Sequence, residues 1–143
     1  MRISVALSAL IIGLLVYTGC ITETEFQCPE GLQEVVRFEL FFGLDHADGR
    51  SVSPEEWDAF LADTITPRFP QGLSVLEVKG QWQRPDRVIE RENTKMVMLV
   101  TPPPIEDGMT LIDEISQEYA RRFDQDPVFR SISQNECVGL YAG

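Results

Sequence analysis

The chain has 143 residues, of which 12 are basic and 23 acidic, so its formal net charge is −11 at pH 7. This balance argues against nucleic acid as a partner, because a phosphate backbone is bound through clustered lysines and arginines, and the longest basic run is Arg121-Arg122. The length suits one hydrophobic core rather than two. Phosphate-loop and dinucleotide motifs are missing from the sequence, and we expect no cofactor.

Residues 1–20 have the order of an export signal: Arg2, an apolar run, and small residues before Cys20. This order resembles the lipobox of bacterial lipoproteins, in which residues 1–19 are removed and the cysteine carries palmitate or a similar acyl chain. The resemblance implies a cell-envelope protein held to the membrane by the lipid on Cys20. Ile21 in place of Asp implies the outer membrane, facing the periplasm. Tyr17 stands where the lipobox usually has Leu, so an uncleaved anchor and a soluble secreted protein remain alternatives.

The segment 20–33 contains polar residues together with Pro29 and Gly31 and has no periodicity, which is typical of a tether. A single domain, residues 34–143, follows it. Residues 34–44 alternate in polarity and predict a strand. The apolar face of this strand carries Val36, Phe38, Leu40 and Phe42.

A helix is predicted to begin at Ser53, because Pro54 suits the first helical position and Glu56 completes a capping box with Ser53. Its apolar stripe would consist of Trp57, Phe60, Leu61 and Ile65, and Pro67 would end it.

Two strands are predicted next, over residues 73–83 and 88–101. Gly80 within the first indicates a bulge or a close approach of another chain segment. In the second, residues 95–100 are apolar on both faces, apart from Lys95, and this places them in the interior of the sheet.

Three consecutive prolines, residues 102–104, stop the sheet. A second helix is predicted over residues 107–123 and a last strand over 128–138. The order βαββαβ predicts an α+β domain of the ferredoxin-like kind: a four-stranded antiparallel sheet with strand order 4-1-3-2 and two helices on one face.

The two cysteines other than Cys20 are Cys28 and Cys137. Thiols of exported proteins pair, and the predicted topology places the start of the first strand beside the end of the last. We therefore predict a disulfide between them. Two free thiols are the alternative, and zinc is disfavoured because two cysteines and one histidine are too few ligands, so we predict no metal site.

Several short motifs together resemble a family of small exported bacterial proteins known as domain of unknown function 3574. The resemblance covers nearly all of the chain after Cys20, and it implies a shared fold and an exported address without an established activity. The matching residues are 39–43 (Glu-Leu-Phe-Phe-Gly), Glu56-Trp57 with Phe60, 66–70 (Thr-Pro-Arg-Phe-Pro), Gly72-Leu73, 80–82 (Gly-Gln-Trp), 90–92 (Glu-Arg-Glu), Lys95 and Cys137.

The sheet face opposite the helices is the candidate functional surface, because a two-layer fold leaves it uncovered. We expect it to carry Val35, Arg37, Glu39 and Phe41 from the first strand and Lys95, Val97 and Leu99 from the third. Arg68, Gln81 and Trp82 are candidates for its edge. A second subunit, an envelope protein, a peptide, a small ligand or a loop of the chain would cover this apolar area.

Catalysis is the weaker hypothesis. The single histidine, His46, lies in a polar turn without a nucleophile motif. Glu39 and Glu90 could act as acids or bases of a small hydrolase or isomerase, with Arg37 or Lys95 stabilising an oxyanion. Ion pairing across a half-exposed sheet explains the same residues without catalysis. The sequence therefore favours a non-enzymatic lipoprotein that binds a ligand or partner, either as a monomer or as a homodimer.

Overall fold

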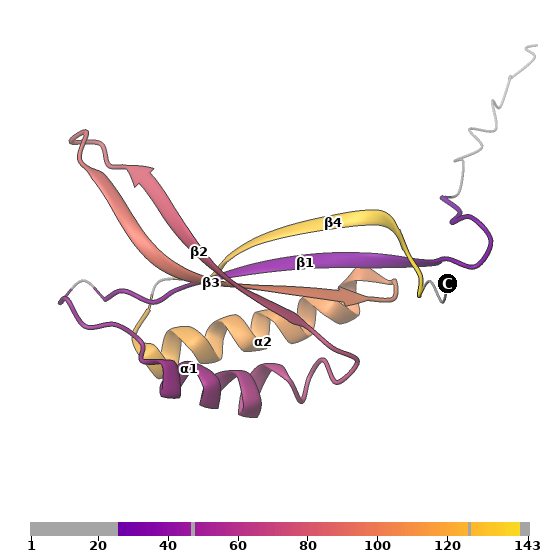
Figure 1. The fold of residues 1–143 in the computed structure, drawn as a ribbon, viewed down its shortest axis with the longest axis horizontal. Helices are drawn as coiled ribbons and strands as arrows, with labels where there is room; N and C mark the ends of the chain where they lie inside the picture. The colour runs from indigo at the N-terminus through magenta and orange to yellow at the C-terminus, as the bar shows by residue number, and fades with distance from the viewer. Residues whose placement is uncertain (1–25, 47, 126, 141–143) are drawn as a thin grey trace, which may run out of the picture.

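The computed structural model describes residues 26–46, 48–125 and 127–140. Its elements follow the order β1 (Gln33–Gly43), α1 (Pro54–Phe60), β2 (Ser74–Gln83), β3 (Ile89–Thr101), α2 (Ile105–Phe123) and β4 (Phe129–Val138). The strands form one antiparallel sheet in the order β2-β3-β1-β4, as the sequence predicts. Both helices cover the same face, and the far end of the β2–β3 hairpin bends away from them (Figure 1). The fold is α+β and ferredoxin-like.

The core lies between the sheet and the helices. All four apolar residues of β1 that were expected to face the helices are buried, including Phe38 and Phe42 at 0% exposure. Phe42 packs edge-on against Tyr119 of α2 with a centroid distance of 4.8 Å, and against Trp57 of α1 at 5.3 Å. This aromatic cluster fixes both helices to the end of β1, one of the two central strands of the sheet.

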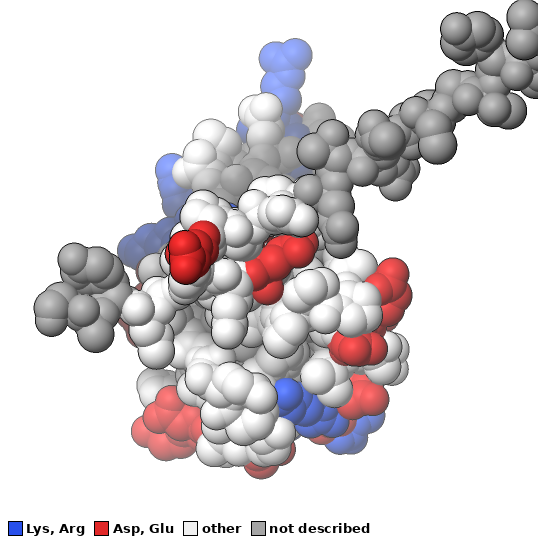
Figure 2. Space-filling view, turned by 90° about the vertical axis from the view of Figure 1, so that its right-hand side faces the viewer, with Lys and Arg blue, Asp and Glu red and all other residues white. Residues whose placement is uncertain are grey.

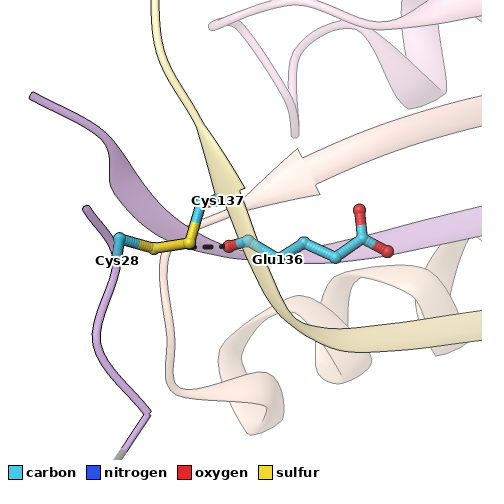
Figure 3. Close-up of a disulfide and its surroundings, with 3 residues drawn as sticks. All are labelled: Cys28, Glu136 and Cys137. Carbon is cyan, nitrogen blue, oxygen red and sulfur yellow. Dashed lines mark hydrogen bonds between the residues drawn. A yellow bond between two sulfur atoms is a disulfide. The ribbon is translucent and has the colours of Figure 1, made fainter.

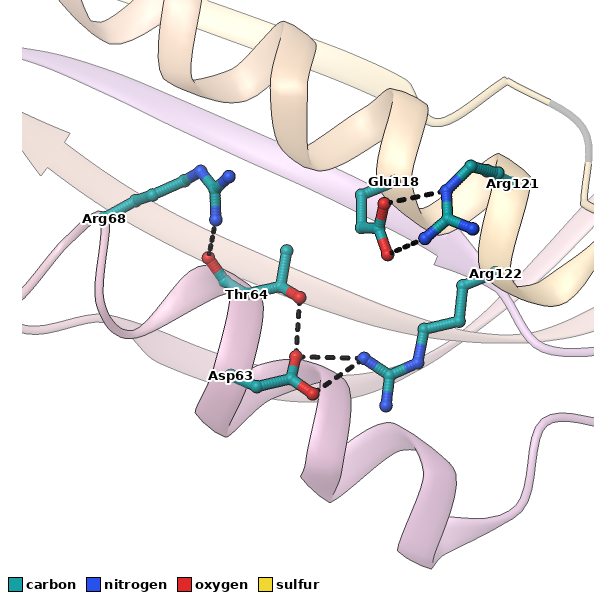
Figure 4. A network of polar contacts seen from close by, with 6 residues as sticks. All are labelled: Asp63, Thr64, Arg68, Glu118, Arg121 and Arg122. Atoms are coloured by element: carbon teal, nitrogen blue, oxygen red, sulfur yellow. Dashed lines mark hydrogen bonds and ion pairs between the residues drawn. The ribbon is translucent and has the colours of Figure 1, made fainter.

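The capping box predicted for α1 is confirmed: Oγ of Ser53 accepts the N–H of Glu56, and the Glu56 carboxylate accepts the N–H of Ser53. The helix continues into a π-helical turn, Leu61–Ile65, which the sequence did not predict. In this turn Asp63 accepts two hydrogen bonds from Nη1 of Arg122 on α2 (Figure 4). The two helices are therefore joined by a charged pair at their surface as well as by the core.

The predicted disulfide is confirmed. Cys28 and Cys137 are bonded, with their Cα atoms 5.6 Å apart, and they link the segment before β1 to the end of β4 (Figure 3). Glu34 of β1 pairs with Cys137 of β4 in the ladder, so the bridge reinforces a junction that strand pairing already makes.

The predicted facing of β3 is wrong. Leu99 is paired with Phe38 and Val97 with Leu40, and directly opposed residues share a face, so both side chains lie in the core at 1% and 0% exposure. Lys95, opposite Phe42, also lies on the helix-covered face. The uncovered face receives Met96, Met98 and Val100 instead.

The predicted irregularity at Gly80 is also wrong. β2 pairs with β3 in one uninterrupted register, with Gly80 opposite Glu92. A Cβ at Gly80 would meet its nearest neighbour at 3.7 Å, an ordinary contact distance. Gly80 is therefore neither a bulge nor a point of close approach.

The export signal, Cys20 and the start of the predicted tether, up to residue 25, lie outside the described residues. Within the described part of the chain, neither helix is long and apolar enough to span a membrane.

Candidate functional site

The open face, by which we mean the sheet face without helices, is largely apolar along its middle. Phe41 of β1 stands beside Met96, and Glu39 beside Met98. Val100 of β3 and Leu76 of β2 are exposed at 43% and 44%. Side chains of this kind on adjacent strands of a two-layer domain form an uncovered apolar surface.

Charged groups on the open face are paired with one another. Arg37 contacts Glu39 at 3.2 Å and Glu136 of β4 at 3.0 Å. Viewed from the end where β1 begins and β4 ends, acidic groups are scattered among uncharged surface (Figure 2). Basic groups lie beside acidic ones at the lower right and, far behind, over the β2–β3 hairpin (Figure 2). No single charged patch marks a site on this side.

A pocket of about 650 Å³ lies where the β2–β3 hairpin bends away from the sheet, near the end of β1. Its walls come from all four strands and the loop after α2. They include Phe41 of β1, Val78 and Trp82 of β2, Glu92 and Thr94 of β3, Gln125 of the loop and Phe129 of β4. Apolar walls with a few converging polar groups are the usual composition of a small-molecule site.

The aromatic walls of the pocket are accessible. Phe41 and Phe129 contact each other with ring centroids 5.5 Å apart. Phe129 is 70% exposed and Trp82 is 49% exposed. Exposed aromatic side chains that line one hollow offer a flat apolar group two surfaces on which to stack.

The polar side of the pocket is built around Gly43. A Cβ on Gly43 would lie 2.0 Å from Oε1 of Glu92, so the missing side chain makes room for this carboxylate. From the opposite side, the Tyr119 hydroxyl donates to the Gly43 carbonyl at 2.6 Å. Burial raises the pKa of Tyr119, with a further contribution from the Glu92 charge, so the phenol stays neutral and remains a donor at physiological pH.

Gln125 contributes a buried donor. Its Nε2 atom is buried and has no hydrogen-bond partner among the residues that the structure describes. Buried polar groups are normally paired. A ligand in the pocket could supply the hydrogen-bond acceptor for this N–H group.

Asp45 holds the loop after β1 against β3 beside the pocket. Its carboxylate accepts hydrogen bonds from the backbone N–H of Asn93 at 2.9 Å and from the Ser51 hydroxyl at 2.8 Å. The Asn93 hydrogen bond is the main cause that lowers the pKa of Asp45 below its ordinary value of 3.8.

This lowered pKa predicts a loss of stability in acid. A carboxyl group whose pKa is depressed on folding stabilises the fold fully above its unfolded pKa, and the contribution disappears as the pH falls through the lower, folded pKa. We therefore expect the melting temperature to decrease once the pH is lowered below about 4. The Asp45→Asn variant should be less stable than the parent at pH 7 and should lose less on acidification, as calorimetry at several pH values would measure. Equal pH dependence in both proteins would contradict this role.

Three of the residues singled out in the sequence, Phe41, Gln81 and Trp82, come together at the pocket. Arg68 lies on the helix side, where it donates to the Thr64 carbonyl at 2.8 Å (Figure 4). Lys95 pairs with Glu77 on the helix-covered face. Arg37 and Glu39 lie on the open face but outside the pocket lining.

Glu39 and Glu90, the two carboxylates considered for catalysis, are not brought together. Glu39 is opposite Met98 of β3. Glu90 precedes Met98 by eight residues in β3, which corresponds to roughly 26 Å at the usual strand rise. Glu90 pairs with Arg84 at 2.9 Å. Each carboxylate is held by an arginine, although not by the pairing between strands that the sequence suggested: Arg37 lies on the same strand as Glu39, and Arg84 lies in the turn between β2 and β3.

Glu92, Thr94, Gln125 and Phe129 are pocket residues that the sequence did not single out as functional. Glu92 stands in the Glu-Arg-Glu motif at residues 90–92, which was a usable signal. Gln125 follows a helix end in an irregular loop, where no periodicity marks it. Among residues 26–46, 48–125 and 127–140, no group of three or more His, Cys, Asp or Glu side chains is arranged to hold a metal ion.

Comparison with known proteins gives a family and a fold. The family model described as "Protein of unknown function (DUF3574)" matches residues 37–139. No curated protein sequence matches the chain. A phage SAM lyase in complex with S-methyl-5'-thioadenosine matches with a TM-score of 0.55 and 19% identity over 77% of this chain and 92% of that one.

The apo form of the phage enzyme gives a TM-score of 0.55 and 18% identity over 83% of this chain and 97% of that one. CutA from Synechococcus elongatus PCC7942 gives a TM-score of 0.47 and 8% identity over 74% of this chain and 80% of that one. At these identities the similarity to the phage enzyme is one of fold.

Proposed function

This chain belongs to the DUF3574 family, and we propose that it is an exported, lipid-anchored protein that binds a small molecule in the pocket on the open face of its sheet. The pocket itself carries this proposal. It combines accessible aromatic walls, formed by Trp82 and Phe129, with a buried amide donor on Gln125.

The lining suggests the chemistry of the ligand. A flat apolar ring would stack on Trp82 or Phe129, and an oxygen or ring nitrogen would accept a hydrogen bond from Gln125. The carboxylate of Glu92 would select against an anionic group close to Gly43. We therefore propose an uncharged or cationic ligand with an aromatic or similarly flat apolar part.

S-methyl-5'-thioadenosine, the compound named with the phage enzyme of similar fold, has this character, because it joins an aromatic base to an uncharged thioether. It is the first defined compound to test. The similarity of fold supports the choice of compound and does not extend to lyase activity.

Binding fits the geometry better than catalysis by Glu39 and Glu90. These carboxylates are far apart and ion-paired, whereas hydrolytic or isomerising pairs of carboxylates act on one substrate from close range. In a binding protein, conversion of either residue to Gln should leave ligand affinity nearly unchanged.

The proposed anchor suits the position of the pocket. Chain residues before β1 lead to Cys20, and the pocket lies at the other end of β1. β1 has 11 residues, which span roughly 36 Å. A protein anchored through Cys20 could therefore hold its pocket well away from the membrane surface.

Native mass spectrometry of the full chain, purified in mild detergent from its own membranes, tests the pocket. We expect a bound small molecule on the parent protein and much less of it on Trp82→Ala and on Phe129→Ala. An aromatic contact worth about 1.4 kcal/mol corresponds to a tenfold change in affinity, so each variant should retain the molecule at least tenfold more weakly. Val88→Ala removes an equally exposed apolar side chain outside the pocket and should retain the molecule.

The variants should melt close to the parent, since both aromatic side chains are exposed. A parent protein that carries no added mass, or a bound molecule equally retained by Trp82→Ala and Val88→Ala, would contradict the proposal.

A further inference from the structure

β2 is a free edge of the sheet. It pairs with β3 along its whole length of ten residues, without a register shift, and no other described strand pairs with it. The opposite edge, β4, is interrupted by a shift of register and contains Asn135 with a positive φ of 58°. Irregularities of this kind protect an edge against pairing, and β2 lacks them.

We propose that β2 pairs antiparallel with β2 of a second copy of this chain, with Val78 of both copies at the two-fold axis. When two copies of one strand pair about a two-fold axis within one continuous sheet, directly opposed residues point to the same face. Because side chains alternate between the faces, the two opposed residue numbers are both odd or both even, and the axis passes between two copies of one residue. With Val78 at the centre, Glu77 of each copy is opposite Lys79 of the other. The pairing is therefore complementary in charge at two symmetric positions.

Neighbouring registers lack this complementarity. A centre at Glu77 would oppose the two Glu77 side chains, and a centre at Lys79 would oppose the two lysines, and like charges directly opposite each other destabilise a sheet. Lys79 is exposed and forms no ion pair within the described chain, whereas Glu77 is 83% exposed even though it contacts Lys95. Both groups are therefore accessible to a partner.

Side-chain size is complementary in the same register. On the open face, Trp82 of one copy is opposite Ser74 of the other, and Leu76 is opposite Gly80. Each large side chain thus meets a small one, and Trp82 and Leu76, exposed at 49% and 44%, gain a neighbour. This arrangement gives Gly80, which is regular and uncrowded within one chain, a reason to lack a side chain.

The resulting assembly would be one continuous eight-stranded antiparallel sheet. The open faces of the two copies would lie on the same side of this sheet and form one continuous surface. Ser74 of the second copy would lie beside Trp82 in the wall of the pocket. The pairing does not depend on the identity of any pocket ligand, so it can be tested separately.

Cysteine crosslinking in the full chain, in its native membranes, tests this register. Val78→Cys places two thiols directly opposite each other, with Cα atoms roughly 4.5–5.5 Å apart, within the range of a disulfide. We expect a covalent dimer on a non-reducing gel. Val75→Cys is the matched control, because its counterpart would lie six residues along the partner strand, roughly 20 Å away, and we expect at least tenfold less dimer.

Charge reversal then tests complementarity. Lys79→Glu, introduced into the Val78→Cys protein, opposes two pairs of like charges and should reduce the crosslink at least fivefold. Co-expression of this chain with a second chain that carries Glu77→Lys and Val78→Cys should restore it as a mixed dimer. Lys79→Glu changes an exposed side chain, so an unchanged melting temperature would show that it folds. Absence of the Val78 crosslink, equal crosslinking at Val75, or full crosslinking in Lys79→Glu would each overturn the proposal.

Discussion

Removal of the Cys28–Cys137 disulfide is expected to lower the melting temperature by on the order of 10–20 °C. The bridge joins residues 109 positions apart, and closure of so long a loop restricts the unfolded chain by about 4.7 kcal/mol in the chain-entropy model, which is an upper figure. Since native domains are stable by only about 5–15 kcal/mol, the reduced protein should unfold much more readily. Calorimetry with and without a reductant measures the difference.

The double variant Cys28→Ser with Cys137→Ser should melt like the reduced parent, and a reductant should not affect it further. Each single variant would leave one free thiol and should be no more stable than the double variant. If a thiol reagent labelled both cysteines in unreduced protein taken from the envelope, the bridge would not exist there. A reductant would then leave the melting temperature unchanged, against the prediction.

Replacement of Cys20 is expected to abolish membrane attachment. If the thiol of Cys20 carries the lipid, Cys20→Ala should incorporate no labelled palmitate. The protein should then leave the membrane fraction or accumulate as the uncut precursor, because the acyl chains are its only proposed anchor. Cell fractionation and metabolic labelling measure both effects. Cys28→Ser is a suitable control, since it also removes a thiol and should keep the label.

The competing interpretations of the N-terminal segment give different results in the same experiment. An uncleaved anchor would keep the unmutated protein in the membrane at its precursor mass and without palmitate. A secreted protein would be found in the soluble fraction without lipid. Either result for the unmutated protein would contradict lipidation.

The topology was predictable because each element carries a local signal. Alternation in β1, the capping box at Ser53 and the helical spacing of Ile112, Ile115 and Tyr119 all concern residues close in sequence. The disulfide followed from the topology, since a 4-1-3-2 sheet brings Cys28 and Cys137 to one corner. Boundaries of the strands and of α2 differ by no more than about two residues, as end effects in helices and strands allow.

The facing of β3 was not predictable, because residues 96–100 are apolar on both sides. A strand without alternation gives no sign of which side chains face the core, and a shift of one residue exchanges the faces. Lys95, the charged residue just before this stretch, was expected on the uncovered face. It lies on the helix-covered face instead, where its amine reaches Glu77 at 2.6 Å and its side chain is 18% exposed.

The pocket was predictable only in part. The predicted facing of the first strand drew attention to Phe41, and the Gly-Gln-Trp motif drew attention to Trp82. The pocket itself exists because the β2–β3 hairpin bends away from the helices (Figure 1) and the loop after α2 lines one side. Neither the bend nor the loop has a sequence signal. Gln125 therefore becomes a candidate only once the tertiary structure places it in the pocket lining, whereas Glu92 also stands in a short sequence motif.

Quenching of tryptophan fluorescence by acrylamide tests the central claim, occupancy of the pocket, most directly. The chain has two tryptophans. Trp57 is 3% exposed and Trp82 is 49% exposed, so acrylamide should reach only Trp82, and Trp82→Phe supplies the baseline. In protein purified from its own membranes, we predict that Trp82 is shielded. Reversible unfolding and dialysis should make it quenchable, and the organic extract of the native protein should shield it again. Equal quenching of Trp82 in the native, stripped and extract-treated protein would contradict a ligand in this pocket.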